Sequence, residues 1–210
     1  MGFLSWLRSW LRSRRTLGAA ISAAQQGRLK DAVSSFQEHL GANPTDWDAW
    51  SGLGECQQAL GELNAAEHAF QRSLELNPES IESSEGLALI YAERDHDWGR
   101  ALSILDEQLK KATEAGVPDF VEISLAWVHH LKGDDGKAAE YFDRRLRSMD
   151  WENLGVEEDA QFAHAEYHLG MLCRALKSDA ECAREHLQKA IRLSPESIYA
   201  QQAQQAILSG

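Results

Sequence analysis

Residues 47–78 read WDAWSGLGECQQALGELNAAEHAFQRSLELNP, and this stretch decides the fold. Apolar and small residues recur at helical spacing on both sides of Gly61, which predicts two amphipathic helices joined by a turn. Gly54 and Ala66 are small enough to let the two helices approach closely, and Phe70 would fill the space beside them. One helix pair of this size cannot bury its own apolar face, so the rest of the chain is expected to supply neighbours.

The same stretch resembles a tetratricopeptide (TPR) repeat. It follows the repeat's signature of about 34 residues, W-x2-L-G-x2-Y…A-x3-F…P, except that Gln57 stands in place of the tyrosine. The matching residues are Trp50, Leu53, Gly54, Ala66, Phe70 and Pro78. The resemblance implies an all-α fold and a superhelix of helical hairpins. It also implies that the first helix of each hairpin lines a concave groove, where peptides usually bind.

Further repeats are expected on both sides of this stretch. Four residue pairs lie 34 positions apart: Ala32 and Ala66, Phe36 and Phe70, Leu40 and Leu74, and Pro44 and Pro78. We therefore predict a TPR-type right-handed α-solenoid of about five helical hairpins with a C-terminal capping helix. The predicted hairpins span 16–46, 47–80, 81–118, 119–150 and 160–195, and the cap spans 196–210. In the third hairpin the turn at 95–97 gains one residue.

Composition narrows the function classes. The chain has 210 residues and a net charge of −12, which disfavours nucleic-acid binding by phosphate neutralisation. Its three cysteines, Cys56, Cys173 and Cys182, form no C-x-x-C pair, which favours a reducing compartment. The same count argues against a disulfide framework or a thiolate zinc site. No run of about eighteen apolar residues occurs, so no membrane span is predicted.

Residues 1–15, MGFLSWLRSWLRSRR, differ from the rest of the chain. Their apolar side chains fall on one helical arc, and serine and arginine take the other side. No acidic residue precedes Asp31. Tryptophan opposite arginine is typical of a helix that lies in a membrane interface. The residues expected in that interface are Phe3, Trp6, Leu7, Arg8, Trp10, Leu11, Arg12 and Arg15.

Two other interpretations of this segment stay open. A mitochondrial transit peptide would also be amphipathic, rich in Arg and Ser, and free of acids. A capping helix would pack its tryptophans on the first hairpin, although a cap needs no string of arginines. A secretory signal is disfavoured because arginines interrupt the apolar core, and Trp6 breaks the myristoylation pattern.

Catalytic motifs are missing from the sequence. It contains no G-x-S-x-G, no phosphate loop and no Gly-rich dinucleotide turn. His164 and His168 lie four residues apart, which would suit two metal ligands, but no third ligand has a recognisable spacing. We interpret them as packed or exposed helical residues, and we predict no enzyme, no metal site and no cofactor. An enzyme that uses His164, His168 or Cys173 is a distant third reading.

The groove is the expected binding site, by analogy with TPR geometry. Its expected lining is Asp48, Ser51, Glu55, Gln58, Glu82, Glu85, Leu89, Phe120, Ile123, Trp127, His130, His164, Tyr167, Met171 and Arg174. The first half of this surface is acidic, and the second half is apolar and aromatic. A partner with basic residues followed by apolar anchors would fit it.

These observations predict a non-enzymatic scaffold or adaptor. It would bind a protein or peptide partner in the groove, and residues 1–15 would tether it to an anionic membrane surface from the cytoplasm. The alternative is a soluble assembly factor whose N-terminal segment is a transit peptide, which would place it in mitochondria. That segment could also dock into the groove and produce homo-oligomers, because its charge is opposite to that of the groove.

Overall fold

A computed structural model describes residues 15–115, 121–148 and 163–209. Regular secondary structure in these residues is helical throughout, which confirms the predicted all-α solenoid of hairpins. Residues 15–25 form the first described helix. The others are α2 (Leu29–Ala42), α3 (Trp47–Ala59), α4 (Leu63–Leu76), α5 (Ile81–Glu93), α6 (Trp98–Ala115), α7 (Val121–Lys132), α8 (Asp135–Ser148), α9 (Ala163–Leu172), the π-helical turn η2 (Cys173–Lys177), α10 (Ala180–Leu193) and α11 (Ile198–Ser209). The segment 1–14, with most of the predicted membrane helix, lies outside the described residues.

Side chains at the helix starts explain where several helices begin. Asp46 accepts a hydrogen bond from the backbone N–H of Ala49 at 3.2 Å, at the start of α3. Ser80 does the same for the N–H of Ser83 at the start of α5. Such caps satisfy backbone donors that have no partner inside the helix, and each stabilises a helix by about 1 kcal/mol.

The turns inside the hairpins need a left-handed backbone. Gly27, Gly61 and Gly133 have φ values of 69°, 78° and 86°, a conformation that glycine adopts without steric cost. The turn at 95–97, which the sequence predicts to be one residue longer, instead places His96 at φ 54°.

Phe70 occupies the centre of the packed hairpins. Its side chain is fully buried and belongs to a core cluster that runs from Ala66 to Ala183. A second cluster joins the helix at 15–25 to α2 and α3 and includes Phe36. Consecutive hairpins therefore share their apolar residues, as a repeat array requires.

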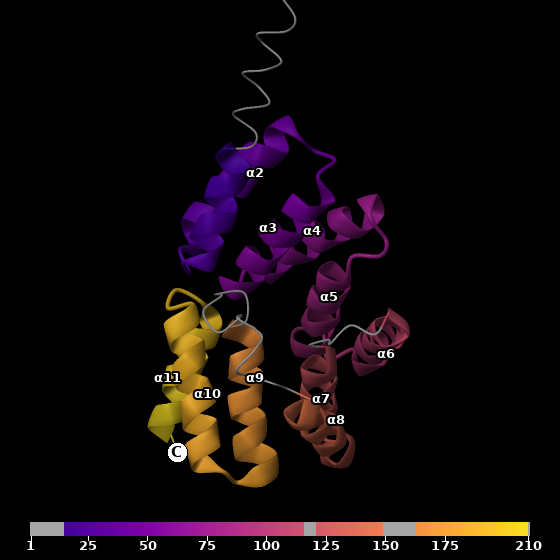
Figure 1. The fold of residues 1–210 in the computed structure, drawn as a ribbon, viewed down its shortest axis with the longest axis vertical. Helices are drawn as coiled ribbons and strands as arrows, with labels where there is room; N and C mark the ends of the chain where they lie inside the picture. Colours follow the sequence, from indigo (N-terminus) through magenta and orange to yellow (C-terminus); the bar gives the residue numbers. More distant parts are fainter. Residues whose placement is uncertain (1–14, 116–120, 149–162, 210) are drawn as a thin grey trace, which may run out of the picture.

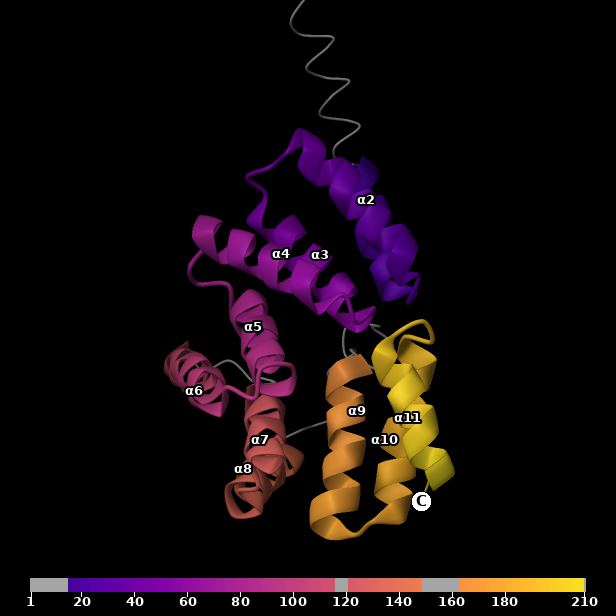
Figure 2. The ribbon, with the colours of Figure 1, turned by 180° about the vertical axis from the view of Figure 1, so that it is seen from behind.

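The array curves until its end meets its beginning. Figures 1 and 2 show α2, α3 and α4 at the top, α5 to α8 down one side and α9, α10 and α11 on the other, with the start of α11 beneath α2. A Cβ on Gly27 would lie 3.2 Å from Cδ of Pro195, and a Cβ on Gly61 would lie 2.9 Å from Cγ2 of Ile198. The last helix and the segment before it therefore pack on the turns of the first two hairpins and close the solenoid into a ring.

The sequence-based argument against disulfide bonding of the cysteines is wrong. A disulfide joins Cys173 and Cys182, whose Cα atoms lie 6.0 Å apart. These residues are nine positions apart in sequence. The tight turn between the end of η2 at Lys177 and the start of α10 at Ala180 brings the two side chains together. Cys56 is the remaining cysteine and is a buried thiol.

Candidate functional site

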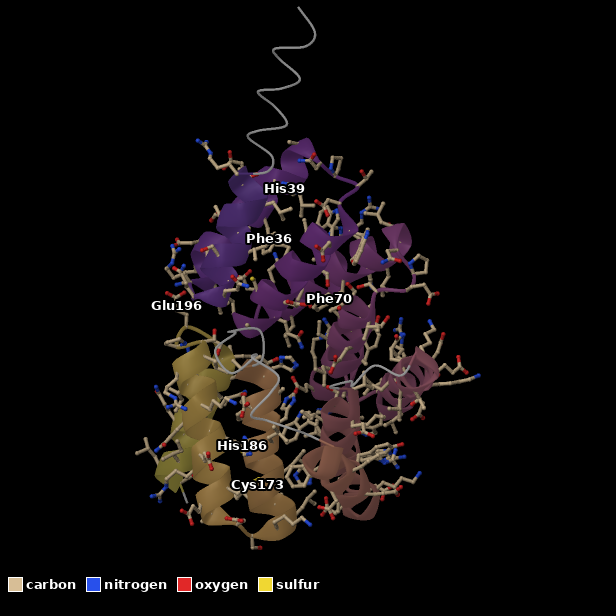
Figure 3. All side chains as sticks on the ribbon, in the orientation of Figure 1. Phe36, His39, Phe70, Cys173, His186 and Glu196 are labelled. Atoms are coloured by element: carbon tan, nitrogen blue, oxygen red, sulfur yellow. A yellow bond between two sulfur atoms is a disulfide. The ribbon has the colours of Figure 1, made fainter. Side chains whose placement is uncertain are left out.

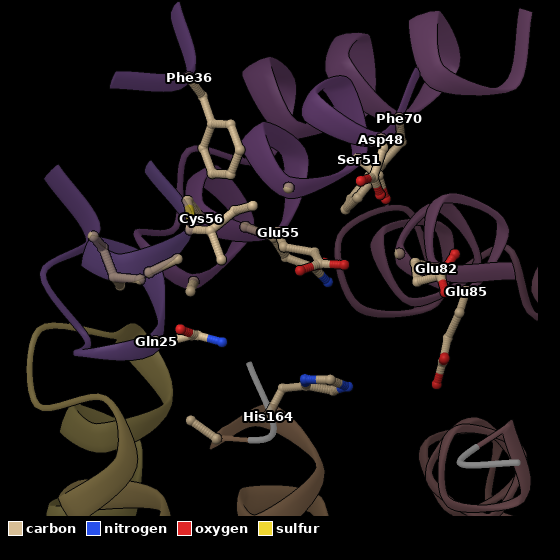
Figure 4. Close-up of a pocket in the computed structure, with 18 of the residues that line it drawn as sticks. Gln25, Phe36, Asp48, Ser51, Glu55, Cys56, Phe70, Glu82, Glu85 and His164 are labelled. Atoms are coloured by element: carbon tan, nitrogen blue, oxygen red, sulfur yellow. The ribbon is translucent and has the colours of Figure 1, made fainter. Parts of the chain in front are cut away.

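Closure of the ring leaves a cavity of about 500 Å³ on its inner side. Its walls come from the helix at 15–25, α2, α3, α4 and α5, and from the first turns of α9 and α11. Figure 4 shows Gln25, Glu55 and His164 directed into this space from three different helices. The cavity therefore combines the first helices of several hairpins with the C-terminal end of the chain.

Four carboxylates line this cavity. Asp48 and Glu55 lie two turns apart on one face of α3, and Glu82 and Glu85 lie one turn apart on α5. Because α3 and α5 pack side by side, the two acidic faces lie next to each other. We call these four residues the acidic cluster.

The acids of this cluster repel one another. Partial burial, followed by the negative charges of Asp46 and Glu82, raises the pKa of Asp48 above its usual range. Such a raised pKa means that the negative charge of Asp48 is less stable here than in water. A positive charge placed in the cavity would relieve this repulsion.

Polar contacts hold the cavity walls in place. Ser83 on α5 donates a hydrogen bond to Ser51 on α3 at 3.0 Å, which links the two helices that carry the acidic cluster. Ser124 on α7 donates to Glu85. The side chain of Gln58 contacts that of Tyr199, so α11 is attached to α3 at the cavity wall. The helices that carry the acidic cluster are thus hydrogen-bonded to each other and to their neighbours.

Beneath the acids the wall is apolar. Phe36, Phe70 and Leu89 contribute to the lining, together with Cys56. Burial, reinforced by the charge of Glu55, raises the pKa of the Cys56 thiol to about 12. A thiol with such a pKa stays protonated and is a poor nucleophile. Cys56 is therefore a small core residue and not a reactive thiol.

The structure brings together the first half of the predicted groove. Eight of the predicted residues line the cavity: Asp48, Ser51, Glu55, Gln58, Glu82, Glu85, Leu89 and His164. Of the others, Tyr167 and Met171 are half-buried against neighbouring helices, and His130 contacts Asp135 at 2.8 Å. Arg174 is exposed and donates to the carbonyl of Ala206. Phe120 lies outside the described residues.

The prediction of an open aromatic groove along α7 is wrong. Ile123 and Trp127 are 1% and 6% exposed and belong to the hydrophobic core. The reason is that α7 packs against four helices, α5, α6, α8 and α9. Eight of its twelve residues are buried, Ile123 and Trp127 among them, so these two side chains do not line an open groove.

The side chain of His168 is buried in the core, where it contacts Trp127 and Glu93. Its ring stacks on Trp127 with centroids 4.6 Å apart, and its Nε2 lies 3.1 Å from Oε1 of Glu93. The indole N–H of Trp127 donates to the same oxygen at 2.8 Å. Burial raises the pKa of Glu93, but the hydrogen bonds and charge of His168, with the hydrogen bond from Trp127, lower it overall. The two histidine rings of His164 and His168 meet edge to face at 6.0 Å.

Most of the other cavity residues were not predicted, among them Ile21, Gln25 and Tyr199. Ile21 and Gln25 precede α2, and Tyr199 belongs to the predicted cap. The place of Tyr199 in the cavity depends on ring closure, which no local pattern encodes. The only hint in the sequence is the pair Ile198 and Tyr199, two large side chains in a segment rich in glutamine.

Comparisons with known proteins agree with this architecture. The sequence profile of the tetratricopeptide repeat family matches residues 23–90. A crystal structure of a thermophilic TPR protein from Thermus thermophilus superposes with a TM-score of 0.65 at 19% identity, covering 93% of this chain and 99% of that one. At this identity the likeness concerns the fold.

Two curated proteins are similar over about half of the chain. Superkiller complex protein 3 of Homo sapiens is 29% identical over 126 residues, which are 57% of this chain and 8% of that protein. The cytochrome c-type biogenesis protein CycH of Bradyrhizobium diazoefficiens is 30% identical over 116 residues, 55% of this chain and 26% of that protein. The matched part is thus a small fraction of each relative. Across the described residues, no helix is both long and apolar enough to cross a membrane.

Proposed function

The chain is a tetratricopeptide repeat protein, and from this premise we propose that it is a non-enzymatic adaptor that holds a basic segment of a protein partner in its cavity. The observation that carries the proposal is the acidic cluster. Asp48, Glu55, Glu82 and Glu85 converge on one hollow, on the inner side of the ring. TPR helices commonly present such inner surfaces to peptides.

Lysine or arginine side chains suit this hollow for two reasons. Each cation would sit near several carboxylates, and it would stabilise the negative charge of Asp48, whose pKa is raised by burial and then by the charges of Asp46 and Glu82. Charge complementarity of this kind favours fast association and rejects acidic competitors. The partner's cations therefore determine which segment enters.

An apolar residue beside the cations would add affinity. Ile21 is exposed, and it lines the same cavity as Leu89 and Phe36. A partner side chain placed there would remove apolar surface from water at about 25 cal/mol per Å². The proposed ligand is therefore an extended or helical segment that carries basic residues and one apolar anchor.

The proposal includes a peripheral tether. Residues 1–15 carry Trp6 and Trp10 on one arc and Arg8 and Arg12 on the other. Apolar burial and attraction to anionic lipid would act together in such a segment. The adaptor would then present its cavity beside a membrane, where basic juxtamembrane segments of other proteins are concentrated.

A second candidate function is a soluble assembly factor. The likeness to CycH, a cytochrome c-type biogenesis protein, favours this alternative. In it residues 1–15 act as a targeting peptide, or dock in the acidic cavity of their own or another chain. Both candidates use the same cavity, so one set of cavity variants tests both.

The experiment is a crosslinked pull-down from native membranes with three proteins. They are the full-length chain, a chain that begins at Thr16, and full-length protein with Glu55→Lys and Glu82→Lys. An adaptor should recover a partner with the first protein and lose it with the charge-reversed one. The chain from Thr16 should recover it only from detergent extracts, where no tether is needed.

The matched control reverses two exposed acids that lie outside the cavity lining, Glu38 and Glu62. It changes the net charge by the same amount, so it should keep the partner. Loss of the partner in both charge-reversed proteins would show that overall charge, and not the cavity, is responsible.

A further inference from the structure

A second cluster of reactive side chains lies away from the cavity. Cys173 begins η2, and Cys182 and His186 lie one turn apart on the same face of α10. One ligand atom from each of the three residues falls within 4.8 Å of the other two. Figure 3 shows Cys173 and His186 side by side in the lower half of the α9–α10 hairpin, whereas the cavity lies at its upper end.

The imidazole of His186 is already oriented by a carboxylate. Its Nδ1 lies 2.7 Å from Oε2 of Glu166 on α9, and the side chain of Glu166 is 5% exposed. Lys189 in turn contacts the other oxygen of Glu166 at 2.9 Å. Because Nδ1 contacts the carboxylate, Nε2 is the nitrogen that we assign to the metal. Histidine ligands of metal sites are held by carboxylates in this way.

The backbone also fixes the position of Cys182. Asp179 caps α10 and accepts hydrogen bonds from the backbone N–H groups of Glu181 and Cys182, at 3.1 Å and 2.9 Å. Ser178 adopts φ 52° in the turn that precedes the cap. The backbone N–H of Asp179 donates to the carbonyl of Cys173 at 3.2 Å, so the start of α10 is linked to η2 by a contact that does not involve the sulfur atoms.

We propose that reduction of the Cys173–Cys182 disulfide creates a zinc site, in which Cys173, Cys182 and Nε2 of His186 bind Zn²⁺ and a water completes the tetrahedron. Two thiolates and one imidazole form a donor set that Zn²⁺ prefers. The spacing C-x8-C-x3-H matches no familiar zinc motif, which is why the sequence argued against a thiolate site. Glu166 is a positioning residue, since it acts through His186.

Conversion of the disulfide to the zinc site requires a reductant, and the reverse conversion requires an oxidant. A dithiol reductant transfers two electrons and two protons to the disulfide, becomes a disulfide itself, and leaves two protein thiols. Binding of Zn²⁺ releases both thiol protons to water, so affinity is expected to rise with pH. A peroxide then takes two electrons from the bound thiolates and, with two protons, becomes two waters, while the disulfide re-forms and Zn²⁺ is released.

Either the disulfide or the bound Zn²⁺ would hold η2 to α10, next to α11, the helix that closes the ring. α10 packs on α11. The segment before α11 contacts Gly27, and Ile198 at the start of α11 contacts Gly61. The reduced, zinc-free protein is then the loosest of the three states. Binding of Zn²⁺ to the native state should raise its melting temperature by mass action.

The test uses full-length protein with Zn²⁺ alone as the probe. Protein is reduced with a dithiol, desalted without oxygen, incubated with Zn²⁺ and passed through a gel-filtration column, and bound zinc is measured by elemental mass spectrometry. We expect one zinc per chain after reduction and none in the oxidised protein. Equal zinc content in the two states would overturn the proposal, and this comparison needs no mutation.

Variants then locate the site. Cys182→Ser and His186→Gln should each abolish stoichiometric zinc, whereas Cys56→Ser and His68→Gln, which alter a cysteine and a histidine outside the cluster, should keep it. Glu166→Gln should weaken zinc binding by about 10–100-fold. At saturating Co²⁺ this variant should keep the thiolate-to-metal charge-transfer band, because both cysteines still bind the metal. Loss of both the band and the affinity would indicate a purely structural role of Glu166. Retention of zinc by folded Cys182→Ser protein, checked by circular dichroism, would refute the assignment.

Discussion

The ring of Phe70 occupies the space that a side chain on Gly86 would need. A Cβ on Gly86 would lie 2.4 Å from both Cε2 and Cζ of Phe70, far closer than van der Waals contact. A Cβ on Gly54 would meet the same ring at 2.6 Å. Phe70 on α4 thus packs against α3 of its own hairpin and α5 of the next, and the two glycines allow this close approach.

Phe70→Ala is expected to lower the free energy of unfolding by about 3–5 kcal/mol, because the surrounding helices cannot close the cavity left by a buried aromatic ring. Its neighbours share this core, so the loss should also loosen the adjacent hairpins. Thermal and urea unfolding measure the effect. A melting temperature within a degree of wild type would contradict the assigned register.

Gly86→Ala tests the same contact from the other side. The added methyl group would force the Phe70 ring out of its place, at a cost of about 1–3 kcal/mol. Gly41→Ala is the control, since nothing lies within 4 Å of a Cβ at that helical position. The control should leave stability unchanged or raise it. Equal urea midpoints for both variants would show that the Phe70–Gly86 contact is not tight.

Glu93 should make stability fall at acidic pH. Its pKa is lowered in the folded protein relative to the ordinary 4.5, so its contribution is complete above that pH and is lost as the pH falls through the folded value. Urea midpoints measured from neutral pH to below 4.5 should therefore decrease. The decrease should be smaller in Glu93→Gln protein, which has no carboxylate to protonate. Parallel curves for both proteins would contradict the assigned role of the carboxylate.

Residues 1–15 should carry the protein to anionic vesicles in a flotation assay. Trp6→Glu with Trp10→Glu should release it, whereas Trp6→Phe with Trp10→Phe should keep most of the binding, because apolar area is retained. High salt should weaken but not abolish flotation, since only the charge attraction is screened. Equal flotation by the chain that begins at Thr16 would rule out the tether.

The helices and hairpins could be predicted because their signals are local. Period-3.6 apolar residues and Gly27 and Gly61 at turns specify each hairpin without reference to distant residues. The cavity could be predicted only in part. Its acidic cluster follows from position on α3 and α5, but its far wall depends on contacts such as Ile198 with Gly61, between opposite ends of the chain.

The errors have the same origin. Trp127 was expected on an open face, because position on a first helix does not reveal that α9 stacks His168 on it. The pairing of Cys173 with Cys182 depends on the turn between η2 and α10, and cysteine spacing alone does not report it. In each case the deciding contact lies between helices whose relative placement no periodic pattern encodes.

The central claim is that a basic partner segment enters the acidic cavity, and site-specific photo-crosslinking tests it most directly. Gln25 and Gln26 are both exposed and adjacent in sequence, but only Gln25 is among the residues that line the cavity. A photo-reactive residue at position 25 should give one discrete partner adduct, which disappears in the Glu55→Lys, Glu82→Lys background. The same residue at position 26 should give none. Equal adducts from both positions, or an adduct at 25 that survives the charge reversal, would contradict the account.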